Sequence, residues 1–197
     1  MLAAYGLRVP NGGVAENPVG AAQLAAGLIG EMVVKGLGFA HKTEAGAVRL
    51  NLSNTDEVLT AAQSMPGAGG FLVEEMVGDA VAELIVGVVR DPVYGFTLTI
   101  GAGGTLTELL DDSVTLLMPS TRQCFRKALE TLKVFRVLCG YRGKPAADID
   151  AILDAIEAVQ RFVTEHADKV HELDINPLIA TPVSVVAVDA LMIQAHG

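Results

Sequence analysis

Apolar residues recur along the chain with two spacings, which separate the predicted helices from the predicted strands. Residues 148–167 carry the clearest helical pattern, because their apolar positions fall three or four apart and trace one stripe. Other helices are expected where a polar capping residue precedes such a pattern. These are Asn17 to Gly30, Asn54 to Met65 with Glu57 completing a capping-box pattern, and Ser120 to about Leu138.

Shorter apolar stretches, several of them alternating with polar residues, predict strands. The expected strands are 31–36, 47–52, 71–77, 81–90, 95–101, 105–110, 114–118, 172–180 and 183–193. Helices and strands do not alternate regularly along the chain, and a run of strands occupies its middle. This order predicts an α+β protein with two lobes, a small one over residues 1–76 and a larger one over residues 77–197.

Composition narrows the class of protein. Of the 197 residues, 51% are hydrophobic and 19% are charged, which is typical of a folded globular chain. A net charge of −9 without a long basic run argues against a nucleic-acid surface. The apolar runs are shorter than the roughly 18 residues of a membrane span. With no leader-like start, we expect a cytoplasmic protein whose Cys124 and Cys139 are free thiols.

The first ten residues have the pattern of a helix end. Gly6 follows a short helical stretch as a C-terminal stop, and Pro10 comes shortly after it. This pattern suggests a segment of a longer chain.

Two polar groups suggest a phosphate site near the start of the chain. Lys35 ends an apolar strand, where it is either a fixed cation for a phosphate or a lysine whose stem is buried and whose amine reaches water. His41 follows closely, before Gly46, whose backbone allows close approach of an anion. His41 is either structural or a nucleophile that accepts a phosphoryl group.

Two further groups lie later in the chain. Glycines between Gly101 and Gly104 precede Glu108, and they form either a turn or a phosphate-facing loop. Asp174 and Asn176 alternate along one predicted strand and so share a face, and a hairpin would bring Asp189 close to them. Oxygen ligands arranged in this way suit Mg²⁺, although turn residues around a proline would give a similar pattern. No Walker motif is present, so a nucleotide site here would not be a P-loop.

Several motifs, taken together, resemble a known family. They are "VVKGLGFAHKTEAGAVRL", "FLVEEMV", "AELIVGVVRDPVYGFTLTIGAGGTLTELLDD", "GYRGKP" and "ELDINPLI" followed by "VAVDAL". Over Leu2 to Ile193 the chain resembles the ATP-grasp domain of NDP-forming acyl-CoA synthetases, the ADP-forming acetate–CoA ligases that are related to the β subunit of succinyl-CoA synthetase. The resemblance implies an ATP-grasp fold with the nucleotide between two α/β lobes. It also implies an acid–thiol ligase that converts acid, CoA and ATP to acyl-CoA, ADP and phosphate through phosphohistidine.

The resemblance also assigns roles to single residues. His41 would relay the phosphoryl group, and Lys35 would contact the ATP phosphates. The remaining assignments are the hinge Glu74, Glu75, Met76 and Val77 beside adenine, Glu83 beside ribose, Gly103 and Gly104 in the glycine-rich loop of the nucleotide site, Asn176 and Asp189 on Mg²⁺, and Glu108 and Arg142 facing the phosphates. The expected partners are a CoA-binding domain and a phosphohistidine domain, in the same chain or another.

The sequence departs from the family pattern in two places, and three other functions are compatible with it. Ala47 replaces the second glycine of the histidine motif, which requires a negative φ there, and the segment 65–71 is short. The chain would alternatively be a regulatory nucleotide-binding module, another ATP-grasp carboxylate ligase that does not need His41, or a purely structural domain. The resemblance leaves the acid open, and also the choice between ATP and GTP.

Overall fold

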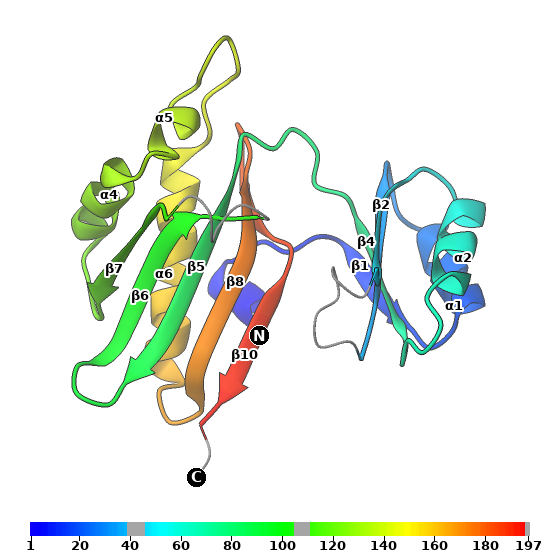
Figure 1. The fold of residues 1–197 in the computed structure, drawn as a ribbon, viewed down its shortest axis with the longest axis horizontal. Helices are drawn as coiled ribbons and strands as arrows, with labels where there is room; N and C mark the ends of the chain where they lie inside the picture. Colours follow the sequence, from blue (N-terminus) through cyan, green and yellow to red (C-terminus); the bar gives the residue numbers. More distant parts are fainter. Residues whose placement is uncertain (39–45, 105–110, 196–197) are drawn as a thin grey trace. The chain divides into compact units, whose positions relative to one another are not determined.

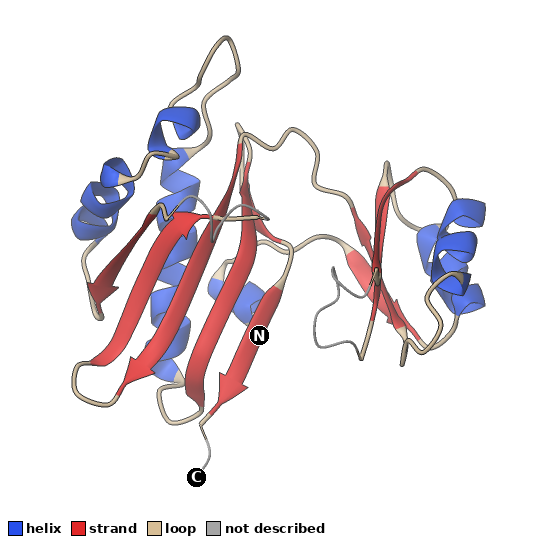
Figure 2. Cartoon of the chain, in the orientation of Figure 1, coloured by secondary structure: helices blue, strands red, loops and turns tan. Residues whose placement is uncertain are grey.

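The computed structural model describes residues 1–38, 46–104 and 111–195 (Figures 1 and 2). These residues form two compact units, Pro10–Val77 and a larger one that joins Met1–Val9 to Gly78–Gly197. Residues 1–9, which the sequence analysis assigned to the small lobe, are thus grouped with the larger unit. The predicted strand at 105–110 lies outside the described residues. Both units combine helices with antiparallel sheets, which confirms the predicted α+β class.

The smaller unit is a four-stranded sheet with two helices on one face (Figure 2). Along the chain its elements are β1 Gly12–Ala15, α1 Pro18–Ala25, β2 Met32–Gly36, β3 Val48–Leu52, α2 Thr55–Gln63 and β4 Phe71–Glu75. The sheet order is β1-β4-β2-β3, with every neighbouring pair antiparallel. Met32, Val34, Phe71 and Val73 alternate along β2 and β4 and are buried in the core. Val33 and Lys35 therefore lie on the other face of this sheet.

The two helices of the smaller unit begin where their capping residues predict. The Asn17 side chain accepts a hydrogen bond from the Gly20 N–H at 2.9 Å, and the Asn54 side chain accepts one from the Glu57 N–H at 2.9 Å. The Glu57 carboxylate accepts in return from the Ser53 N–H at 2.7 Å, one residue before the usual capping-box position. Helix α1 ends at Ala25, five residues earlier than predicted.

The larger unit is a six-stranded sheet backed by the long helix α6 (Figure 1). Its strands follow the order β10-β8-β5-β6-β7, and β9 pairs with β8. The elements are η1 Leu2–Tyr5, β5 Ala82–Asp91, β6 Gly95–Ala102, β7 Ser113–Leu117, α4 Arg122–Thr131, α5 Phe135–Leu138, α6 Ile149–Glu165, β8 Val170–Ala180, β9 Val185–Ala187 and β10 Ala190–Gln194. The apolar stripe of α6 packs against the buried residues of β5, β6 and β8, as its periodicity predicted.

Residues near the N-terminus are attached to the end of α6. The Tyr5 ring packs edge-on against Phe162, with 5.4 Å between ring centroids. The Tyr5 hydroxyl donates to Glu165 Oε2 at 2.6 Å, and Arg161 donates to the Tyr5 carbonyl at 3.0 Å. These contacts, together with the hydrogen bond from the Ala187 N–H to the Arg8 carbonyl at 2.9 Å, explain why residues 1–9 belong to the larger unit.

The prediction of one helix from Ser120 to Leu138 is wrong. Thr121 rather than Ser120 caps α4, and the chain leaves the helical conformation at Leu132. The buried carboxylate of Asp112 explains the break, because it accepts the backbone N–H groups of Lys133 at 2.7 Å and Val134 at 2.8 Å. A distant side chain thus caps the start of α5.

The prediction of one strand over residues 183–193 is also wrong. Val188 and Asp189 separate β9 from β10, so Asp189 lies at a strand break instead of within a strand. No helix within the described ranges is long and apolar enough to cross a membrane.

Candidate nucleotide and metal site

Lys35 lies near the end of β2, on the sheet face opposite α1 and α2. Only 8% of the residue is exposed, although lysine is rarely buried without a charged partner. Its Nζ atom lies 2.7 Å from Glu74 Oε2, a carboxylate on the neighbouring strand β4. The smaller unit therefore places a cation on the sheet face that the helices do not cover.

The predicted hinge residues Glu74 to Val77 extend from β4 to the end of the smaller unit. The Glu75 N–H donates to the Asn11 carbonyl at 2.8 Å, and the Met76 N–H donates to the Glu31 carbonyl at 2.7 Å. The Glu75 carboxylate binds the Asn11 side-chain amide at 2.8 Å and the Ile29 N–H at 3.2 Å. These contacts fix the backbone of the segment, and they engage two of its N–H groups within the unit.

Backbone conformation agrees with the replacement of glycine by Ala47. Gly46 has φ +63, in the left-handed region that favours glycine, whereas Ala47 is not among the residues with positive φ. The Ala47 carbonyl accepts the Gly36 N–H at 2.7 Å. The substitution is therefore compatible with the local backbone. His41 itself lies outside the described residues.

Gly103 and Gly104 lie in the larger unit, where β6 ends beside the start of β5. The Gly103 N–H donates to the Glu83 carbonyl at 2.8 Å, and the Gly104 N–H donates to Asn176 Oδ1 at 3.1 Å. A side chain at Gly103 would come within 2.5 Å of the Leu84 backbone, and Gly104 has φ +79. Both positions therefore require glycine, for close approach in one case and for conformation in the other. The exposed carboxylate of Glu83 lies beside Gly104.

Asn176 on β8 and Asp189 at the break between β9 and β10 are neighbours. The Asn176 N–H donates to the Asp189 carbonyl at 3.2 Å, and Asp189 Oδ1 accepts the Ala190 N–H at 3.0 Å. The predicted approach of these two residues therefore occurs. Through Gly104, Asn176 also joins the glycine segment to this pair.

Asp174 adds negative charge close to this pair, on the face of β8 that points away from the core. Burial raises the pKa of Asp174, and the nearby carboxylates of Glu172 and Asp189 raise it further. A cation would relieve this repulsion. Within the described ranges, no three His, Cys, Asp or Glu side chains are grouped closely enough to hold a metal alone. A magnesium site here would therefore need oxygen atoms from the ligand and from water, as is usual for Mg²⁺.

The remaining predicted site residues are Glu108 and Arg142. Glu108 lies outside the described residues. Arg142 lies in the turn after α5 with φ +50, and its guanidinium stacks on the Tyr141 ring at 5.3 Å from the centroid. Asp112 also shapes this end of the sheet, and its role was not predicted. Its carbonyl accepts the Ala102 N–H, and its carboxylate caps α5. Asp112 is the second of two adjacent aspartates, and nothing in the sequence distinguishes the buried one from the exposed Asp111.

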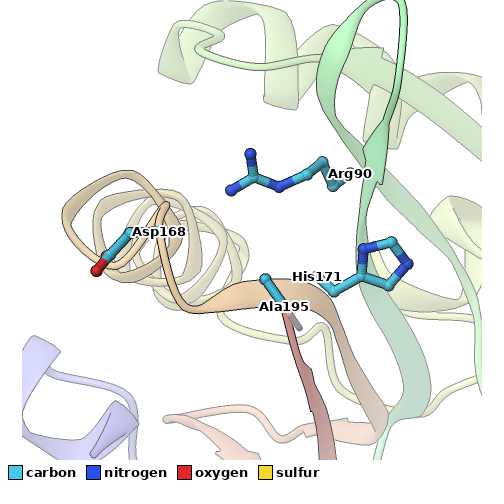
Figure 3. Close-up of a pocket in the computed structure, with 4 residues that line it drawn as sticks. All are labelled: Arg90, Asp168, His171 and Ala195. Carbon is cyan, nitrogen blue, oxygen red and sulfur yellow. The ribbon is translucent and has the colours of Figure 1, made fainter. Parts of the chain in front are cut away.

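A cavity of about 470 Å³ lies at the other end of β5, lined by Arg90, Asp168, His171 and Ala195 (Figure 3). Arg90 is seven residues along β5 from Glu83, which corresponds to roughly 23 Å of extended strand. The Arg90 guanidinium stacks on Phe96 at 4.5 Å from the ring centroid. This cavity is therefore separate from the group around Asn176.

Comparison with known proteins identifies the family to which the chain belongs. Residues 1–193 match the family model described as the ATP-grasp domain. The chain belongs to the ATP-grasp family. The resemblance and the predicted ATP-grasp fold are thereby confirmed, and the relatives are ADP-forming acid–CoA ligases.

Two curated relatives show how much of such a ligase this ATP-grasp chain corresponds to. It is 35% identical to acetate–CoA ligase (ADP-forming) I of Archaeoglobus fulgidus, with 98% of this chain and 30% of the relative covered. It is 32% identical to the β subunit of acetate–CoA ligase (ADP-forming) I of Pyrococcus furiosus, with 98% of this chain and 88% of the subunit covered. The chain therefore spans less than a third of one relative and most of the other.

Solved structures show the same fold. The dinucleotide-forming acetyl-coenzyme A synthetase 1 of Ca. Korarchaeum cryptofilum, in complex with coenzyme A, Ca-AMPCP and HgCl⁺, has a TM-score of 0.89 and 31% identity. The alignment covers 98% of this chain and 89% of that one. Another structure of the same protein contains coenzyme A and Mg-AMPPCP, and its TM-score is 0.84. ATP-grasp relatives of this chain thus bind a magnesium nucleotide.

Proposed function

We propose that this chain is the ATP-binding and phosphoryl-relay part of an ADP-forming acyl-CoA synthetase. The hydrogen bond from the Gly104 N–H to Asn176 Oδ1 carries the proposal, because it joins the glycine segment to the pair of oxygen-bearing residues in the larger unit. The buried cation Lys35 in the smaller unit supports it independently. CoA-binding and phosphohistidine domains, in the same chain or a partner, would complete the enzyme.

The residues present suit a magnesium nucleotide. Asn176 and Asp189 would hold Mg²⁺, which supplies neutralisation of phosphate charge when bound. Gly103 and Gly104 leave room for a phosphate beside the backbone, and Lys35 would contact the phosphates. The hinge Glu74–Val77 would border adenine, with Glu83 near ribose. Glu108 and Arg142 would face the phosphates.

His41 is proposed to relay the phosphoryl group. An imidazole nitrogen attacks the γ-phosphorus, the bond to the β-γ bridging oxygen breaks, and ADP leaves while the ring releases its proton. Labelling the protein with γ-³²P ATP should give acid-labile label, and His41→Ala should abolish it while retaining nucleotide binding. Label of equal amount on His41→Ala would exclude this residue as the acceptor.

Calorimetric titration with ATP, with and without Mg²⁺, tests the nucleotide site. Wild-type protein should bind ATP more tightly in the presence of Mg²⁺. Asp189→Asn should weaken the Mg²⁺-dependent part roughly tenfold or more, since even outer-shell groups of metal sites have effects of that size. Asp168→Asn, an exposed carboxylate in the same unit, is the matched control and should bind as the wild type does. Metal dependence unchanged by Asp189→Asn would place the metal elsewhere.

The titration and the phosphoryl labelling together separate an active module from a regulatory one and from a structural domain. A regulatory module would bind nucleotide without labelling His41, whereas a structural domain would bind none. If the chain alone binds no nucleotide, the titration should be repeated in the presence of the CoA-binding and phosphohistidine domains that the proposal requires. Continued absence of binding there would refute the proposed function.

A further inference from the structure

The contact between Lys35 and Glu74 is an unusual feature of the smaller unit. The two side chains are 10% and 13% exposed, so both charges are largely removed from water. The Nζ and Oε2 atoms are 2.7 Å apart, but Oε2 receives no hydrogen bond of good geometry from the described residues. The interaction is therefore an ion pair held by charge and by the sheet, and burial makes it stronger than a surface pair.

The register of the sheet explains how the two side chains meet. Lys35 lies opposite Leu72, and Val33 lies opposite Glu74, so Lys35 and Glu74 are diagonal neighbours on the same face of β2 and β4. This is the face that α1 and α2 do not cover. The pairing is therefore determined by the backbone of two central strands, and not by a mobile loop.

Gly12 provides the space for Glu74 on its other side. Gly12 pairs with Glu74 across β1 and β4. A Cβ atom at position 12 would lie 2.9 Å from Glu74 Cγ and would collide with the Val73 carbonyl oxygen. Any side chain there would displace the strand or the Glu74 side chain. The local sequence thus makes room for the Glu74 stem beside Lys35.

A lysine that contacts phosphate must be both charged and correctly placed. Its four-carbon stem has many rotamers, and its ammonium has no preferred fork geometry to restrict them. A fixed carboxylate at one side restricts the ammonium to a small volume and compensates its charge when no phosphate is bound. The same carboxylate would repel a phosphate if it were the direct contact, so its favourable effect would have to act through Lys35.

We propose that Glu74 is a positioning residue that holds the Lys35 ammonium for the nucleotide phosphates. The proposal rests on the proposed nucleotide-binding function. The hinge role expected from sequence concerns the Glu74 backbone beside adenine. The role proposed here concerns the Glu74 carboxylate, which contacts Lys35. It also gives Gly12, which the sequence analysis did not single out, a role in shaping the site.

A double-mutant cycle measured by titration with Mg-ATP tests this role. Glu74→Ala should weaken binding roughly tenfold in the wild-type background, which is within the range of coupling between contacting groups. In the Lys35→Ala background the same change should have less than a twofold effect. Glu74→Gln, which keeps the shape and an oxygen but loses the charge, should lie between wild type and Glu74→Ala. Equal losses in both backgrounds, or tighter binding by Glu74→Ala, would overturn the proposal.

Chemical labelling of Lys35 gives a readout that does not depend on nucleotide. The acylation rate of the Lys35 amine, followed by peptide mass spectrometry, should rise by roughly threefold in Glu74→Ala, because the amine loses the carboxylate that holds it. Glu16→Gln, an exposed carboxylate in the same unit, is the control and should not change the rate. An unchanged rate in Glu74→Ala would contradict the proposal.

Two further comparisons separate the possible failures. Thermal melting of each variant shows whether a loss of affinity reflects unfolding, in which case Glu74→Gln replaces Glu74→Ala in the cycle. If wild type and Lys35→Ala bind Mg-ATP equally, the proposed nucleotide role of Lys35 fails, while the labelling rate still decides whether Glu74 positions the amine.

Discussion

At the scale of single residues, close packing rather than conformation makes glycine necessary at position 103. Its φ is not in the left-handed region, yet a Cβ would lie 2.5 Å from the carbonyl carbon and oxygen of Leu84. We therefore expect Gly103→Ala to lower the free energy of unfolding by about 1–3 kcal/mol, as overpacking does. It should also weaken Mg-ATP binding, because the strand start at Leu84 must move.

Gly78→Ala is the matched control for this prediction. Gly78 also has an ordinary φ, and a Cβ there would meet nothing within 4 Å. Its substitution should leave stability unchanged or raise it slightly. Urea unfolding of both variants gives the comparison, and a similar effect of the two substitutions would contradict the steric explanation.

The Cys124 thiol gives a prediction about pH. The Thr121 hydroxyl lies 3.3 Å from Cys124 Sγ, and its hydrogen bond lowers the pKa of the thiol by stabilising the thiolate. A lowered pKa means that more thiolate is present between pH 7 and 8 than without the hydroxyl. Thr121→Val should therefore slow alkylation of Cys124 by roughly threefold at this pH, since the thiolate is the reactive form.

Thr121→Ser retains the hydroxyl and is the control for loss of the helix cap. It should alkylate at close to the wild-type rate, and the difference between the two variants should vanish at high pH, where every thiol is ionised. The alkylation rate of Cys124 is measured with iodoacetamide and peptide mass spectrometry. Equal slowing in Thr121→Val and Thr121→Ser would refute this account.

At the scale of elements, hydrophobic periodicity and caps predict where helices begin, whereas long-range contacts decide where a predicted helix or strand is broken. The apolar stripe of 148–167 predicted α6, and the caps Asn17 and Asn54 predicted where α1 and α2 begin, because those signals are local. The prediction of one helix over residues 120–138 was wrong because the carboxylate of Asp112, more than twenty positions away, caps a second helix at Lys133. Asp189 was placed within a strand because an apolar run does not reveal a break between two paired segments.

The Asp112 cap gives a prediction at this scale. Asp112 is 8% exposed, and its two oxygens accept the N–H groups of Lys133 and Val134. In Asp112→Asn one oxygen is replaced by an amide donor that faces an N–H group. We expect a loss of about 1–2 kcal/mol in the free energy of unfolding, the usual range for a lost cap.

Asp111→Asn tests whether this loss is specific to the cap. Asp111 is exposed and has φ +43, a conformation that asparagine tolerates. Its substitution should change stability by less than about 0.5 kcal/mol, as is usual at the surface. Urea denaturation of the two variants is sufficient, and equal effects would show that the carboxylate of Asp112 does not stabilise α5.

At the scale of the whole molecule, sequence reasoning identified the family and the approach of Asn176 to Asp189, because the motifs and the alternation of strand residues are both visible in one chain. It did not reveal the Lys35–Glu74 pair, since strand order within the smaller sheet decides which side chains are diagonal neighbours. It also did not reveal that residues 1–9 pack against the larger unit, because the contacts of Tyr5 span 160 positions.

The two units should differ in stability, because their cores differ in size and content. Among the described residues, four of the ten buried members of the smaller core are alanine and one is aromatic, whereas the larger core includes Phe125, Phe162 and many leucines and isoleucines. Small cores bury a smaller fraction of their surface. Hydrogen exchange of the intact chain should therefore show protection for β2 and β4 that is lower by roughly tenfold or more than for β5 and β8.

Saturating Mg-ATP should raise the protection of β2 and β4, because a ligand that binds the folded state stabilises it. Equal protection of the two units without ligand, with a single urea transition, would instead show that they unfold together.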